Sequence, residues 1–88
     1  MSELDLMYDE TEQTQTRFVG FIGQVSRFDV AITETVHFFG KKLVYCMQSG
    51  RSAILTSEEA EDAEYIASAF HVTAEEAEEL SSFLSANL

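Results

Sequence analysis

The chain has 88 residues, a formal net charge of −11 and a single cysteine. This length fits one folding domain with a small core. The 45% hydrophobic and 11% aromatic content excludes global disorder. The acidic balance argues against direct binding of nucleic acid or of anionic membranes, because each phosphate contact needs a cation.

Charge is sorted along the sequence. The net charge is −5 for residues 1–12, +3 for 13–56 and −9 for 57–88. No basic residue follows Arg51, and near residue 56 the spacing of apolar residues changes from alternating to helical. We therefore predict one domain with three parts: an acidic arm (1–14), a β-meander (15–55) and an acidic helical hairpin (56–88).

The first twelve residues are acidic and lack the basic and apolar runs of a signal peptide. No apolar run approaches the roughly 20 residues of a bilayer span. The single cysteine, Cys46, excludes an internal disulfide and fits a reducing compartment. These features predict a cytoplasmic protein without a membrane partner. The arm is expected to be frayed or ordered by a partner, with at most one helical turn.

The middle of the chain has the spacing of strands. Residues 17–25 are rich in β-branched and aromatic side chains, and from Phe28 to Phe38 the apolar residues favour even positions. A period of two predicts a half-buried strand. Residues 43–47 are apolar on both faces and predict a central strand, and 51–55 predict a short fourth strand.

Turn residues separate these strands. We expect turns at Ser26-Arg27, at Gly40-Lys41-Lys42 and at Ser49-Gly50. Two glycines inside the first strand, Gly20 and Gly23, predict a bulge or a close approach by another backbone.

The last third of the chain contains an approximate repeat of helix starts. Leu55-Thr-Ser-Glu-Glu-Ala-Glu-Asp62 aligns with Val72-Thr-Ala-Glu-Glu-Ala-Glu-Glu79. In both copies a threonine stands three residues before a glutamate, which is the pattern of a capping box. The pattern predicts that one helix begins after Thr56 and a second after Thr73.

The expected fold class is α+β: an antiparallel β-meander of three or four strands, followed by a C-terminal α-helical hairpin packed on one face. The open edges of such a meander also favour a homodimer. The residues expected in the core are Phe18, Ile22, Val30, Ile32, Val36, Val44, Ile54, Ile66, Phe70, Leu80, Phe83 and Leu84.

Acids in the first turn of a helix interact favourably with the helix dipole, whereas acids three or four residues apart repel each other. This local balance leaves several helical acids without a structural reason, and an exposed tyrosine lies among them. The residues predicted to bind a basic protein partner are Glu61, Asp62, Glu64, Tyr65, Glu78 and Glu79.

Other functions have weaker support in the sequence. His37, Cys46 and Arg51 on the sheet would serve a small-ligand binder or an enzyme if they converged in a pocket. His37, Cys46 and His71 match no zinc spacing, and no phosphate loop or nucleophile motif occurs. We therefore predict no catalysis, cofactor or metal. An acidic mimic of nucleic acid is a further alternative.

The chain resembles a small uncharacterised family from Gram-positive bacteria of the Bacillus and Staphylococcus group. The resemblance lies in Arg17-Phe-Val-Gly-Phe, Phe38-Phe-Gly-Lys and Cys46-Met-Gln-Ser-Gly-Arg51, together with the helix starts at Thr56 and Thr73. It implies a single cytosolic domain of unknown function and assigns a role to no residue.

Overall fold

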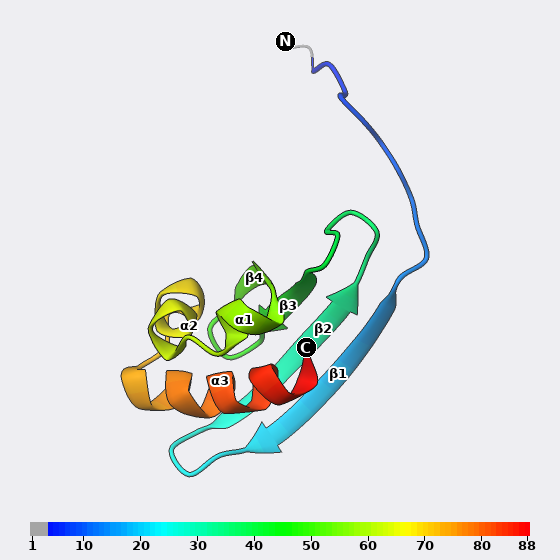
Figure 1. Ribbon diagram of the computed structural model, residues 1–88. Helices are drawn as coiled ribbons and strands as arrows, with labels where there is room; N and C mark the ends of the chain where they lie inside the picture. Colours follow the sequence, from blue (N-terminus) through cyan, green and yellow to red (C-terminus); the bar gives the residue numbers. More distant parts are fainter. Residues whose placement is uncertain (1–3) are drawn as a thin grey trace.

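The computed structural model describes residues 4–88, and Figure 1 shows a four-stranded antiparallel sheet with all helices on one face. The strands lie in sequence order, β1-β2-β3-β4. The elements are β1 (Gln15–Ile22), β2 (Arg27–Glu34), β3 (Lys42–Cys46), β4 (Arg51–Leu55), α1 (Ser57–Ala60), α2 (Ala63–Phe70) and α3 (Ala74–Asn87). The α+β class and the meander are therefore confirmed.

The connections between strands are longer than the sequence predicts. Residues 23–26 form the first turn, so Arg27 is already the first residue of β2 and the turn predicted at Ser26-Arg27 is wrong. A seven-residue loop, 35–41, joins β2 to β3. In the last turn Gly50 has φ +71°, a conformation that side-chain-bearing residues rarely adopt.

The covered face of the sheet is fixed by the pairing register. Val19 lies opposite Val30 and Phe21 opposite Phe28, and these side chains point toward the helices. The Phe21 ring stacks on Phe28 at 5.1 Å and on Phe83 of α3 at 4.4 Å between ring centres. The buried core consists of Phe28, Val30, Ile32, Val44, Cys46, Leu55, Ala60, Ile66, Phe70, Ala77, Leu80 and Leu84.

Three predicted core residues are wrong: Phe18, Ile22 and Val36 are exposed. Side chains alternate between the faces of a strand, and in β1 the odd residues lie opposite the buried residues of β2. Phe18 and Ile22 therefore point away from the helices. Val36 follows the end of β2, where alternation no longer sets its direction.

Two further core predictions hold only in part. Ile54 is half-buried, and its neighbour Leu55 takes the buried position instead. Phe83 is also half-buried, and it packs against the edge of the core through Phe21.

Both predicted helix starts are confirmed. The Thr56 hydroxyl accepts from the amide of Glu59, and the Glu59 carboxylate accepts from the amide of Thr56. Thr73 and Glu76 repeat the same reciprocal pair. Each box satisfies amides that a helix end leaves without an intrahelical partner.

The first predicted helix is interrupted, so the helical part has three helices, of which α2 and α3 pack against each other as the predicted hairpin. Asp62 is extended, with φ −95° and ψ 99°, and its carboxylate accepts from the amides of Glu64 and Tyr65. Aspartate is a favoured N-cap, and it begins α2 only two residues after α1 ends. The α2 helix then ends at His71, which has φ +55°.

Candidate interaction surfaces

The structure gives three of the predicted partner-binding acids internal roles: two accept hydrogen bonds and one lies at a helix start. Asp62 caps α2, as described above, and Glu64 lies in the first turn of that helix, near the positive end of its dipole. Glu79 on α3 accepts from the backbone amide of Gln24 at 2.6 Å and from that of Val25 at 3.4 Å. The expectation that these acids lack structural partners is therefore wrong for Asp62 and Glu79.

Gly23 makes the contact with Glu79 possible. A Cβ at position 23 would overlap the nearer carboxylate oxygen of Glu79. The close approach predicted for Gly23 is real, but the neighbour is a side chain and not a backbone. The turn 23–26 is thereby attached to α3, far along the sequence.

Four of the predicted residues are exposed: Glu61, Glu64, Tyr65 and Glu78. Within residues 4–88, no helical acid forms an ion pair with a basic residue of the sheet. The ion pairs present there are Arg27–Asp29, His37–Glu10, His37–Glu12 and Lys42–Glu34. Attraction between the acidic helices and the basic sheet therefore does not explain these acids.

The alternative site of His37, Cys46 and Arg51 does not form. Cys46 is fully buried at the end of β3, under the helices. Arg51 lies opposite it in the register and is exposed. His37 belongs to the loop 35–41 at the other end of β3. One strand length separates His37 from the other two, so the three side chains share no pocket.

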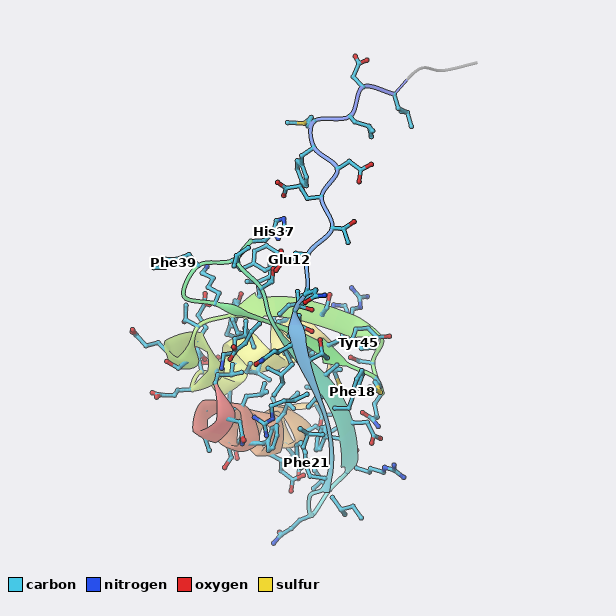
Figure 2. All side chains as sticks on the ribbon, turned by 90° about the vertical axis from the view of Figure 1, so that its right-hand side faces the viewer. Glu12, Phe18, Phe21, His37, Phe39 and Tyr45 are labelled. Carbon is cyan, nitrogen blue, oxygen red and sulfur yellow. The ribbon has the colours of Figure 1, made fainter. Side chains whose placement is uncertain are left out.

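The face of the sheet that points away from the helices is uncovered and carries both apolar and polar side chains. We call it the open face; its apolar residues include Phe18, Ala31, Leu43, Tyr45 and Ile54, and Thr16, Asp29, Thr33 and Ser52 lie on the same face. Phe18, Ala31 and Tyr45 form one row across three strands, and Leu43 and Ile54 pair in the next row. Phe18 is 75% exposed and Tyr45 42% exposed. Figure 2 shows Phe18 and Tyr45 on the side opposite the helices.

The charges beside the open face are neutralised locally. Arg27 donates to the carboxylate of Asp29 from Nε at 3.1 Å, and Gln48 Nε2 donates to the same carboxylate at 2.7 Å. These hydrogen bonds hold the pKa of Asp29 below its usual value, with the Arg27 bond as the larger cause. The open face therefore has an apolar row flanked by polar residues, and it carries little net charge on an acidic protein.

A second polar cluster attaches the N-terminal arm to the loop 35–41. His37 Nε2 lies 2.9 Å from Glu10, and Nδ1 forms an ion pair with Glu12. Glu12 also accepts from the Thr35 hydroxyl at 2.9 Å and from the Val36 amide at 3.3 Å. We call these contacts the arm latch. It holds residues 10–12 beside the loop, and Figures 1 and 2 show the rest of the described arm leading away from the body.

The latch changes the acidity of its members. Hydrogen bonds to Glu10 and then to Glu12 raise the pKa of His37. Burial disfavours the charged form of Glu12, but hydrogen bonds from Thr35, Val36 and His37 outweigh it and lower the pKa of that carboxyl. Both shifts favour a cationic imidazole between two carboxylates. Sequence reasoning missed this cluster, because the contacts join residues 23 or more positions apart.

Within residues 4–88 no group of three or more histidine, cysteine or acidic side chains is arranged to hold a metal ion. In the same part of the chain, no helix has the length and apolarity needed to cross a membrane.

The family model described as SAV0927-like matches residues 7–86, so the chain belongs to this family. The match covers the arm latch, the whole sheet and nearly all of the helices. No curated protein matches the chain.

Proposed function

We propose that this member of the SAV0927-like family is a non-catalytic interaction protein that binds a partner protein through its open face. The proposal is supported by the row of Phe18, Ala31 and Tyr45 on the open face, in which Phe18 and Tyr45 are exposed and Ala31 is half-buried. Contiguous exposed apolar surface on a small protein favours association. Burying a phenylalanine side chain contributes roughly 1.5–3 kcal/mol, and tyrosine is enriched at interfaces.

The net charge of the chain restricts the kind of partner surface that can bind the open face. The chain carries a net charge of −11, so a strongly acidic partner would be repelled at long range. The open face itself holds one charged pair, Arg27 with Asp29, which is satisfied internally. The partner surface that fits is therefore apolar at its centre and neutral or basic around it.

Site-specific photo-crosslinking tests this proposal. A photoreactive phenylalanine analogue is placed at Phe18 on the open face or, as a matched control, at Val25 in the first turn, which is 51% exposed. After irradiation in cells, adducts are identified by mass spectrometry. We expect a discrete protein adduct from position 18 and none from position 25. Equal adducts at both positions, or none at position 18, would contradict the proposal.

A charge variant of the same face supplies the second readout. Phe18→Asp should remove the adduct formed from a photoreactive group at Tyr45, because a carboxylate would be desolvated in the interface. Phe18 makes little contact with the core, so circular dichroism should show an unchanged fold. Persistence of the Tyr45 adduct in a folded Phe18→Asp variant would also contradict the proposal.

A second candidate is the acidic helical surface, through Glu61, Glu64, Tyr65 and Glu78, with a basic protein partner. It is favoured by the absence of ion pairs between these acids and the sheet within residues 4–88. The double variant E61K/E64K should lose a basic partner in pull-downs, whereas D5K/D9K, with the same change of net charge, should keep it. If the captured partner also binds duplex DNA or RNA in competition, the surface is a nucleic-acid mimic.

We further propose a cytoplasmic location in a Gram-positive bacterium of the Bacillus and Staphylococcus group. The support is the single reduced cysteine, Cys46, buried in the core, together with the sequence resemblance described above. A buried free thiol fits a reducing compartment.

A further inference from the structure

The N-terminal arm exposes an unusual amount of apolar surface. Its apolar side chains are almost fully exposed: Leu4 87%, Leu6 76%, Met7 93% and Tyr8 73%. Residues 4–14 form no regular structure, and the chain bends at Met7. Along the sequence, Leu4, Leu6 and Tyr8 alternate with Asp5, Met7 and Asp9. The arm therefore carries exposed apolar side chains with carboxylates next to them.

A pocket of complementary character lies at the same end of the molecule. It has a volume of about 440 Å³, which is within the range of roughly 300–1,000 Å³ typical of ligand sites. We call it the loop pocket. Its apolar walls are Val36, Phe38, Phe39, Leu55 and Leu88, and its basic residues are Lys41 and Lys42.

The two lysines of the loop pocket differ in whether they form an ion pair. Lys42 is paired with Glu34 at 3.2 Å. Lys41 forms no ion pair among the described residues 4–88. Phe39 is 99% exposed at the pocket wall, so an apolar ligand there would cover surface that the monomer leaves in water. A segment that carries both carboxylates and apolar side chains would pair with Lys41 and cover Phe39.

The geometry of the arm latch directs the arm outward. Glu10 and Glu12 hold the base of the arm on His37, and the next described residues lead away from the body (Figure 1). To enter its own pocket the arm would have to reverse direction within a few residues. The segment from Leu4 to Glu10 bends at Met7, yet the described arm continues away from the body and does not turn back toward the pocket (Figure 1). A second copy of the chain has no such constraint.

We propose that the arm of one copy inserts Leu4, Leu6 and Tyr8 into the loop pocket of a second copy, with Asp5 or Asp9 beside Lys41. Exchange in both directions gives a two-fold dimer in which each copy provides one arm and one pocket. Five extended residues span roughly 15 Å, which is enough to reach along a pocket of this volume. The latch fixes the base of the arm in each copy.

Light scattering coupled to size exclusion tests the exchange with the full chain. Wild type should have twice the mass of the chain, and L6D/Y8D in the arm and V36D/F39D in the pocket should each have the mass of one chain. These four residues are exposed or lie outside the core, so folding should be retained. Met7→Asp is the control: Met7 is exposed like Leu6 but is not among the residues placed in the pocket, so this variant should remain a dimer.

Mixing the two monomeric variants separates exchange from other modes of association. The arm variant keeps an intact pocket and the pocket variant keeps an intact arm, so one arm–pocket pair can form between them. We expect native mass spectrometry to detect the mixed dimer and neither variant's own dimer. A wild type that is monomeric at all concentrations, or variants that remain dimers, would overturn the inference. Crosslinking from Phe18 should be unchanged in V36D/F39D. A negative result for the arm exchange would therefore leave the proposed function of the open face untouched.

Discussion

The two faces of the sheet are made by the same four strands but meet different surroundings. On the covered face Phe21 packs between Phe28 and Phe83, whereas three residues earlier on the same strand Phe18 is 75% exposed. Phenylalanine therefore contributes to folding on one face and is available for binding on the other. The apolar content of a small chain therefore need not all belong to its core.

The largest expected difference between the two faces is in their contribution to the free energy of unfolding. Phe28→Ala removes a ring from the buried core and should lower the free energy of unfolding by about 3–5 kcal/mol. Phe18→Ala on the neighbouring strand should change it by no more than about 0.5 kcal/mol. Urea unfolding of both variants measures the contrast. Similar losses would mean that the open face is packed in the native state.

Helix starts on the covered side provide an intermediate test. Asp62→Ala removes the N-cap of α2 and should cost about 1 kcal/mol. Glu61→Ala is the matched control, because the neighbouring side chain makes no hydrogen bond or ion pair among the described residues; it should be close to neutral. If both variants have the stability of wild type, the N-cap of α2 is not a source of stability.

The smallest expected effect concerns the arm latch, which lies outside both faces. The raised pKa of His37 makes its contribution complete below pH 6.5 and lost as pH rises through the raised pKa. The lowered pKa of Glu12 makes its contribution complete above pH 4.5 and lost as pH falls through the lowered pKa. The arm latch should therefore be most stable between pH 4.5 and 6.5.

Hydrogen exchange at the Val36 amide reports the latch, because that amide donates to Glu12. Protection, corrected for intrinsic exchange, should be greatest in the stated pH window and decline on both sides. Glu12→Gln should flatten the profile on the acidic side. A wild-type profile that is already flat would show that the ion pairs do not hold the arm.

Much of the fold follows from local patterns. The alternation at Phe28, Val30 and Ile32 placed these side chains correctly on the covered face of β2. The fourth strand begins and ends where the sequence predicts, at Arg51 and Leu55. Alternation alone was insufficient for β1, because Phe18, Val19, Phe21 and Ile22 supply apolar side chains to both faces.

The candidate surfaces were harder to predict. The sequence singled out Glu61, Asp62, Glu64, Glu78 and Glu79 by their unfavourable local charge balance. Two of these acids have partners that the pattern did not reveal: Asp62 caps a helix that the sequence had joined to its predecessor, and Glu79 binds a turn 54 and 55 residues away in sequence. The one local signal available was Asp62 itself, a residue type that favours helix starts.

Sequence alone determined where the helices after Thr56 and Thr73 begin, because a capping box joins residues only three positions apart and needs no tertiary contact. It also determined the antiparallel meander, since short turns leave adjacent strands little alternative. Tertiary structure decided which face of β1 is buried, where Glu79 binds and how Glu10 and Glu12 meet His37. These depend on strand register and on the position of α3, which bring together residues that are distant in the chain.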